Sequence, residues 1–160
     1  MNSHLLALVQ KYKFKGLLID TNVALLYLVG SFDPSLIRNH SRTAKYTEDD
    51  FDRVSRFVES FPERITTPHV LTEISNLLGR SEGIHAIFVE YIKRAKELYS
   101  DLEASSLAES KAFISYGLTD SAIFETARNK YLVVTDDGPL YGFLAGLNVD
   151  AVSLDQIRMI

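Results

Sequence analysis

Acidic residues that directly follow two apolar runs are the first feature of the sequence that suggests chemistry. Asp20 follows the run 16–19, and Asp136 and Asp137 follow the run 131–135. Neither run alternates apolar with polar residues, which is typical of parallel strands covered on both faces. Because ligands bind beyond the carboxyl ends of such strands, we expect these three carboxylates to lie at one edge of a sheet.

Two more acids lie on predicted helices that can bring them to the same edge. Asp120 stands at the start of a predicted helix over 119–129, and Glu73 stands one turn into a predicted helix over 68–79. Glu73 falls between apolar neighbours, which limits its contact with water. The alternative interpretation of each aspartate is structural, as a helix cap, a first-turn acid or a turn residue after a strand.

Carboxylates that gather without Cys or His favour a hard divalent cation. Like charges within a few ångströms raise each other's pKa unless a cation compensates them. The chain has no Cys, and its four His residues show no ligand spacing, so an oxygen site for Mg²⁺ or Mn²⁺ fits best. Two such ions about 3.5–4 Å apart activate water for phosphodiester hydrolysis. From the acids alone we therefore expect water, rather than a protein side chain, to be the nucleophile.

Strands that alternate with helices predict the fold that positions these acids. Weaker strand patterns lie at 64–66 and 149–152, and Thr47 and Asp50 are spaced like a capping box. Helical apolar spacing covers 47–61, 68–79, 84–98, 105–116 and 119–129. We expect an α/β fold with a central, mostly parallel β-sheet flanked by helices in three α/β/α layers, as a single domain over residues 1–160.

Basic residues gather in the first 45 positions, although the chain carries a net charge of −4. This part contains six basic and two acidic residues, a net charge of +4. Its least periodic stretch, residues 31–46, is expected to form a loop or a mobile flap. Arg38, Arg42 and Lys45 lie there, and we expect them to contact phosphates, with a solvated surface as the alternative.

The composition excludes several classes of protein. With 160 residues, 46% hydrophobic and 24% charged, the chain resembles an ordinary globular domain. The absence of Cys excludes disulfides, thiolate metal sites and a cysteine nucleophile. No apolar run approaches the roughly 20 residues of a membrane span, and the N-terminus lacks a signal-peptide pattern, so we expect a cytoplasmic protein without a membrane partner. No GxxxxGK[ST] or GxGxxG loop supports ATP or dinucleotide binding.

Four segments that contain the acids resemble the PIN-domain nucleases, a family that includes the VapC-type toxins of toxin–antitoxin pairs. The resemblance spans about residues 16–155 and keeps the acids in the family's order. The segments are Leu-Leu-Ile-Asp20-Thr-Asn22-Val, Pro68-His-Val-Leu-Thr-Glu73-Ile, Leu-Thr-Asp120-Ser-Ala-Ile and Leu-Val-Val-Thr135-Asp-Asp137.

The resemblance implies a catalytic metal site and two supporting positions. The residues that match the family's acids are Asp20, Glu73, Asp120 and Asp137. Asp136 adjoins the last of these and is able to share its role or replace it. Asn22 and Thr135 match polar positions that support the site, and a helix N-cap and a strand end are their respective alternatives.

The resemblance also implies a function, a Mg²⁺- or Mn²⁺-dependent endoribonuclease with RNA as its substrate. If the chain is one of the toxins, a small antitoxin protein is its partner. A non-catalytic PIN-like module that binds RNA or a protein is the alternative. Ile84, Phe88 and Tyr91 leave room for a homodimer face on the helix predicted over 84–98, although their helical spacing is more typical of core residues.

Overall fold

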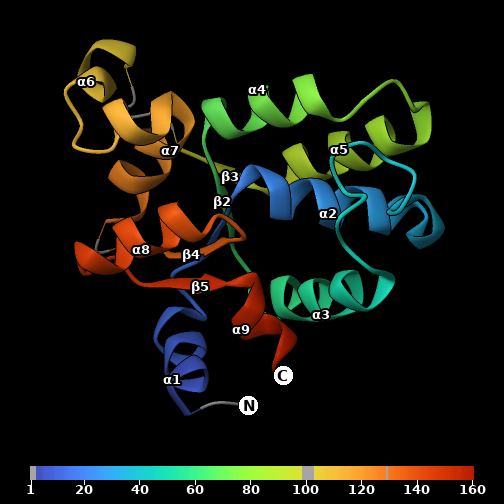
Figure 1. The fold of residues 1–160 in the computed structure, drawn as a ribbon, viewed down its shortest axis with the longest axis horizontal. Coiled ribbons are helices and arrows are strands. Elements are labelled where there is room, and N and C mark those ends of the chain that lie inside the picture. The colour runs from blue at the N-terminus through green and yellow to red at the C-terminus, as the bar shows by residue number, and fades with distance from the viewer. Residues whose placement is uncertain (1–2, 99–102, 129) are drawn as a thin grey trace.

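A parallel sheet forms the centre of the protein. The computed structural model describes residues 3–98, 103–128 and 130–160, and within them five strands pair in the order β3-β2-β1-β4-β5 (Figure 1). The strands are β1 (Leu17–Ile19), β2 (Arg64–Thr66), β3 (Lys96–Glu97), β4 (Leu132–Thr135) and β5 (Ala151–Ser153). Every pair is parallel, with Leu18 opposite Ile65 on one side and Val133 on the other. The α/β fold with a mostly parallel sheet is therefore confirmed.

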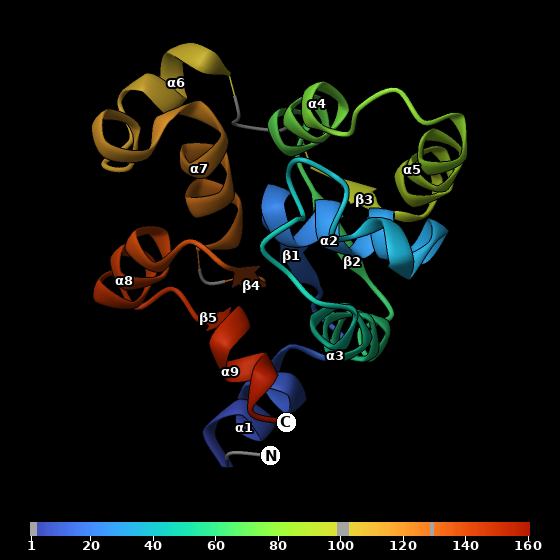
Figure 2. The ribbon, with the colours of Figure 1, turned by 45° about the vertical axis from the view of Figure 1, so that its right-hand side comes forward.

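Helices cover both faces of this sheet. In the described part of the chain they are α1 (Ser3–Tyr12), α2 (Thr21–Phe32), α3 (Glu48–Glu59), α4 (Pro68–Leu77), α5 (Glu82–Arg94), α6 (Ala104–Ala108), α7 (Phe113–Ala127), α8 (Gly138–Gly146) and α9 (Leu154–Arg158). Helix α2 contacts α3, α4 and α5, whereas α7 and α8 contact each other and β4. Figure 2 shows these two groups on opposite sides of the strands, as right-handed crossovers require.

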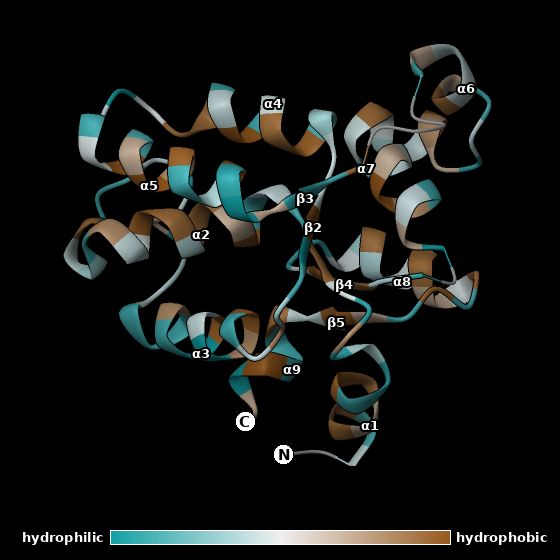
Figure 3. Ribbon diagram, turned by 180° about the vertical axis from the view of Figure 1, so that it is seen from behind, coloured by the Kyte–Doolittle hydropathy of each residue, from teal (hydrophilic) through white to brown (hydrophobic). Residues whose placement is uncertain are grey.

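The core explains why the two apolar runs form the central strands. All residues of β1 and β4 are buried, because helices cover both faces of the sheet there. Helix α2 is also hydrophobic around most of its circumference (Figure 3). This pattern suits a helix that lies between the sheet and other helices rather than on the surface. Among the described residues, no helix combines the length and hydrophobicity of a membrane span.

Local capping signals set several helix ends as predicted. Thr47 and Asp50 form both hydrogen bonds of a capping box at the start of α3. Pro68 occupies the first turn of α4, and Gly79 follows that helix with a φ of +86°. This left-handed conformation is the one in which glycine commonly ends a helix. The carboxylate of Asp50 also binds Arg158 through two hydrogen bonds of 2.7 and 3.1 Å, which tie α9 to α3.

Three expectations about the elements need correction. The helix predicted over 84–98 ends at Arg94, and residues 96–97 instead pair with β2 as the short strand β3. The helix predicted over 105–116 is interrupted, since α6 ends at Ala108 and α7 begins at Phe113. Gly117 does not end a helix but forms a kink within α7, where its φ is +82°. Neither an exposed two-residue strand nor a kink can be predicted from hydrophobic periodicity, because each is too short to show a repeat.

The three residues considered for a homodimer face on α5 belong to the core. The side chains of Ile84, Phe88 and Tyr91 are at most 6% exposed, because they pack into the core of their own chain. The spacing of the aromatic residues is therefore a core signal, as its helical period suggested.

Candidate active site

Asp20 lies at the centre of the candidate site, at the carboxyl end of β1. Its side chain is only 6% exposed and caps α2, accepting a hydrogen bond of 2.6 Å from the backbone N–H of Thr21. Its other oxygen accepts a 2.6 Å hydrogen bond from the hydroxyl of Thr135, at the end of the neighbouring strand β4. The capping role considered for Asp20 is thus confirmed, and the same contacts hold its carboxylate rigidly at the sheet edge.

Thr135 connects Asp20 to the loop that carries the next acids. Besides donating to Asp20, its hydroxyl oxygen accepts a 3.0 Å hydrogen bond from the backbone N–H of Asp137. The carboxylate of Asp137 in turn caps α8 by accepting a 2.8 Å hydrogen bond from the N–H of Leu140. One short chain of hydrogen bonds therefore fixes two aspartates on adjacent strands relative to each other.

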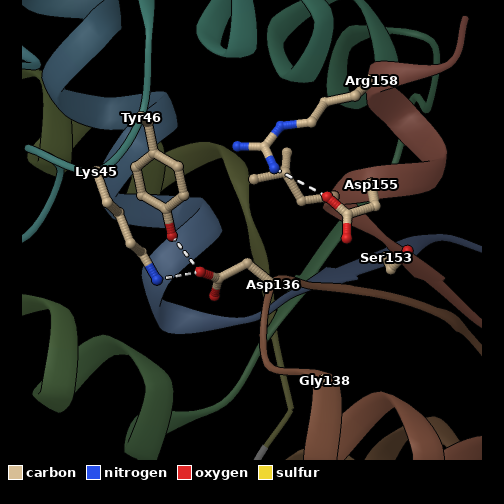
Figure 4. Close-up of a pocket in the computed structure, with 8 residues that line it drawn as sticks. Lys45, Tyr46, Asp136, Gly138, Ser153, Asp155 and Arg158 are labelled. Carbon is tan, nitrogen blue, oxygen red and sulfur yellow. Dashed lines mark hydrogen bonds and ion pairs between the residues drawn. The ribbon is translucent and has the colours of Figure 1, made fainter.

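Asp136 faces a different set of partners. One of its oxygens accepts hydrogen bonds from the ammonium of Lys45 and the hydroxyl of Tyr46, which come from the loop before α3 (Figure 4). The other oxygen is buried and has no hydrogen-bond partner in the described part of the chain. These three residues line a cavity of about 330 Å³ together with Arg158 of α9. The cavity combines cationic and acidic groups next to the site.

Asp120 and Glu73 complete the group of acids. Asp120 lies in the first turn after the kink of α7, and burial raises its pKa to about 7, with added repulsion from Asp20, Asp137 and Glu73. Burial likewise raises the pKa of Asp20 to about 6; its hydrogen bond from Thr135 opposes this shift, and the charges of Asp136 and Glu73 add to it. Asp20 and Asp120 therefore each lie close enough to other predicted acids for the charges of those acids to raise their pKa values.

Glu73 also borders a second hollow beside the acids. It lines a cavity of about 420 Å³ between α4 and α7, together with His69, Asn76 and Thr119. The Nδ1 atom of His69 is buried and has no hydrogen-bond partner among the described residues. His69 was predicted to lack ligand spacing, but it lies four residues before Glu73 on the same helix, a spacing that places both side chains on one face.

Some of the predicted supporting and basic residues line a cavity, and others do not. Asn22 lies within α2 rather than at its cap, so the helix N-cap considered for it is wrong. It lines a cavity of about 390 Å³ with Arg42 and Lys45. The loop predicted over 31–46 begins only after Phe32, the last residue of α2, and contains a 3-10 turn at Pro34–Leu36. It packs through buried side chains such as Tyr46. Arg38 is exposed and lines none of the cavities described here.

The chemistry of these donors fits a hard divalent cation. The group consists of carboxylates, and the charges of neighbouring acids add to the burial that raises the pKa values of Asp20 and Asp120, a repulsion that such an ion relieves. Each oxygen of Asp20 accepts one hydrogen bond and keeps a second lone pair. Within residues 3–98, 103–128 and 130–160, however, no three Asp, Glu or His side chains are placed to hold one ion together.

Comparisons of this chain with known protein families, with curated proteins and with solved structures found no match.

Proposed function

We propose that this protein is a Mg²⁺- or Mn²⁺-dependent endoribonuclease of the PIN-domain type. The observation that carries the proposal is that the charges of Asp20, Asp137 and Glu73 act on Asp120, with Asp20 and Asp137 lying just after the ends of the parallel strands β1 and β4. Burial and mutual repulsion raise the pKa values of two of them to about 6 and about 7. Carboxylates with raised pKa values cluster at functional sites, and proteins with parallel sheets bind ligands beyond the carboxyl ends of the strands.

The chain's own residues have distinct roles in this proposal. Asp20, Asp120 and Asp137 would hold the cation, and Glu73 would bind it or orient the attacking water. A bound divalent ion stabilises the charge that develops on the phosphate and lowers the pKa of water. Thr135 is a positioning residue, since its hydroxyl holds the Asp20 carboxylate and the backbone of Asp137.

The loop before α3 is suited to the nucleic acid backbone. Arg42 and Lys45 lie beside Asn22 in one cavity, and Arg38 is exposed in the same loop. We expect these three cations to contact phosphates. Replacing all three by Gln then lowers the slope of log K for RNA binding against log salt concentration by about 0.7 for each charge removed, as for single-stranded nucleic acids. An unchanged slope would remove the loop from the RNA-binding surface.

Cleavage of labelled RNA tests the proposal. The purified protein is incubated with Mg²⁺, with Mn²⁺ or with EDTA, beside Asp20→Asn, Asp120→Asn and the control Asp52→Asn, which alters an exposed residue of α3. We expect metal-dependent cleavage that falls to the EDTA background in the first two variants and persists in the control. Cleavage that is equal in EDTA, or that survives in Asp20→Asn, contradicts the proposal.

Asp136 and Asp137 are separated by the same assay. Asp137 raises the pKa of Asp120, whereas Asp136 is bound by Lys45 and Tyr46. We therefore expect Asp137→Asn to abolish cleavage and Asp136→Asn to reduce it less. The reverse order would assign the metal-binding role to Asp136.

A non-catalytic PIN-like module is the second candidate, and one contact favours it. Lys45 neutralises Asp136 within the chain, which lessens the need for a metal ion at that carboxylate. Calorimetric titration with Mn²⁺ and the RNA cleavage assay together separate the two functions, because a non-catalytic module binds the metal or RNA without cleaving any RNA.

The toxin role, with a small antitoxin as partner, rests on the sequence resemblance. It is tested by growth arrest on expression, which Asp20→Asn should relieve.

A further inference from the structure

A fourth cavity lies at the opposite edge of the sheet from the acids, where β2 begins. It has a volume of about 470 Å³ and is bordered by α2, α5 and Arg64, the first residue of β2. The candidate active site lies instead where the strands end. The volume falls within the range of about 300–1,000 Å³ that is typical of small-molecule sites.

Two buried hydrogen-bond donors line this cavity without a partner. The hydroxyl of Tyr91 and the Nε atom of Arg64 form no hydrogen bond with any described residue. The Tyr91 side chain is 5% exposed. Burial raises the pKa of Tyr91, so the hydroxyl keeps its proton and remains a donor. Leaving a buried donor unsatisfied costs about 1–3 kcal/mol, so an acceptor in the cavity would relieve a considerable penalty.

The two acids and the two arginines that line the cavity differ in their partners. Glu90 is paired with Lys93 at 3.0 Å, and Glu59 accepts a 3.1 Å hydrogen bond from Ser55. Both acids thus have partners other than the arginines. By contrast, Arg64 and Arg94 form no salt bridge within the described residues. Two cationic groups are therefore left to interact with a ligand.

Apart from Ser31, the remaining residues that line the cavity are apolar or aromatic. Leu28 and Ile87 lie on the two helices, and the rings of Tyr27 and Tyr91 border the same space. A ligand that fits both the walls and the donors has an apolar body and one oxyanion group.

We propose that this cavity binds a small organic anion, a carboxylate or phosphate ester on an apolar or aromatic body. Its oxygens accept hydrogen bonds from the Tyr91 hydroxyl and the Arg64 Nε–H, and Arg94 adds a second positive charge. The guanidinium of Arg64 is suited to this role, since it presents planar donors that match carboxylate and phosphate. The inference is independent of the nuclease proposal, because it uses none of the acids at the other edge.

Binding of two simple anions tests this site. Phenyl phosphate and benzoate are titrated into the protein at millimolar concentrations, with benzyl alcohol as the neutral analogue. Calorimetry measures the dissociation constant, and a ¹H–¹⁵N spectrum of the arginine side chains follows the Nε–H of Arg64. We expect saturable binding of at least one anion, a shift of that signal, and much weaker binding of the alcohol. The stronger of the two anions identifies the preferred oxyanion.

Matched variants locate the binding. Tyr91→Phe removes only the hydroxyl and keeps the ring in the core, and Arg64→Gln removes the guanidinium. Each should weaken binding about ten-fold or more, because each deletes a hydrogen bond to a charged acceptor. Arg80→Gln, an exposed arginine elsewhere, should leave binding unchanged. No binding of either anion, equal binding of benzyl alcohol, or affinities unchanged in Tyr91→Phe and Arg64→Gln would overturn the proposal.

Discussion

Replacing Asp20 by Asn is expected to stabilise the metal-free protein at neutral pH. In the folded protein the carboxylate is almost fully buried, and its pKa rises from 3.8 to about 6, mainly because of burial and also because of neighbouring acids. The folded state therefore holds this proton more tightly than the unfolded state does. An asparagine avoids the burial of a charge and keeps a similar shape.

The magnitude follows from the linkage between pKa and stability. Since the folded pKa is the higher one, the free energy of unfolding decreases as the pH rises from about 4 to about 6, and then no longer changes through this group. The rise in pKa corresponds to about 3 kcal/mol. The amide forfeits one of the two hydrogen bonds that Asp20 accepts, at about 1 kcal/mol. The net gain at pH 7 is thus about 2 kcal/mol, and it disappears near pH 4.

Urea unfolding in EDTA between pH 4 and pH 7 measures this difference. The wild type should lose stability with rising pH more steeply than Asp20→Asn does. Asp120 contributes a slope of the same sign, and removing the Asp20 charge also lowers its pKa, which flattens the curve of the variant further. Asp52→Asn, on the exposed face of α3, should run parallel to the wild type. Parallel curves for wild type and Asp20→Asn would refute the burial and repulsion argued for this carboxylate.

Three further substitutions test the supports of the fold and the site. Thr135→Val should destabilise the protein by about 1–3 kcal/mol in urea unfolding, because it leaves Asp20 with one hydrogen bond fewer, whereas serine at this position should restore most of the loss. Gly16→Ala should destabilise by about 1–3 kcal/mol, since φ is +131° and the new Cβ would lie 2.7 Å from Ile65; an unchanged melting temperature would contradict this. The pKa of Asp50 is lowered, first by its hydrogen bond with the α9 guanidinium, so this residue contributes stability above pH 3.8 that is lost as the pH falls further. Asp50→Asn should remove that part of the acid dependence and lower stability at pH 7, and equal stability of both proteins would count against the ion pair.

Features with a local pattern could be predicted from the residues alone. The strands β1 and β4 are uninterrupted apolar runs because both of their faces are covered, and this burial is visible in the residues themselves. The capping box at Thr47 and Asp50 satisfies backbone groups within one turn, so four residues suffice to predict it. The order of the candidate acids along the chain is likewise given by the residues themselves.

Contacts between residues that are far apart in the sequence depend on how the strands and helices are arranged. The pairing of β1 with both β2 and β4 brings the Thr135 hydroxyl to Asp20 across 115 positions. The contact of Lys45 with Asp136 spans 91 positions. The cavity that joins Arg64 to Tyr91 depends on how α5 packs beside α2. Hydrophobic periodicity reports whether a residue is buried, but not which neighbour buries it, because that depends on the order and handedness of the connections between strands.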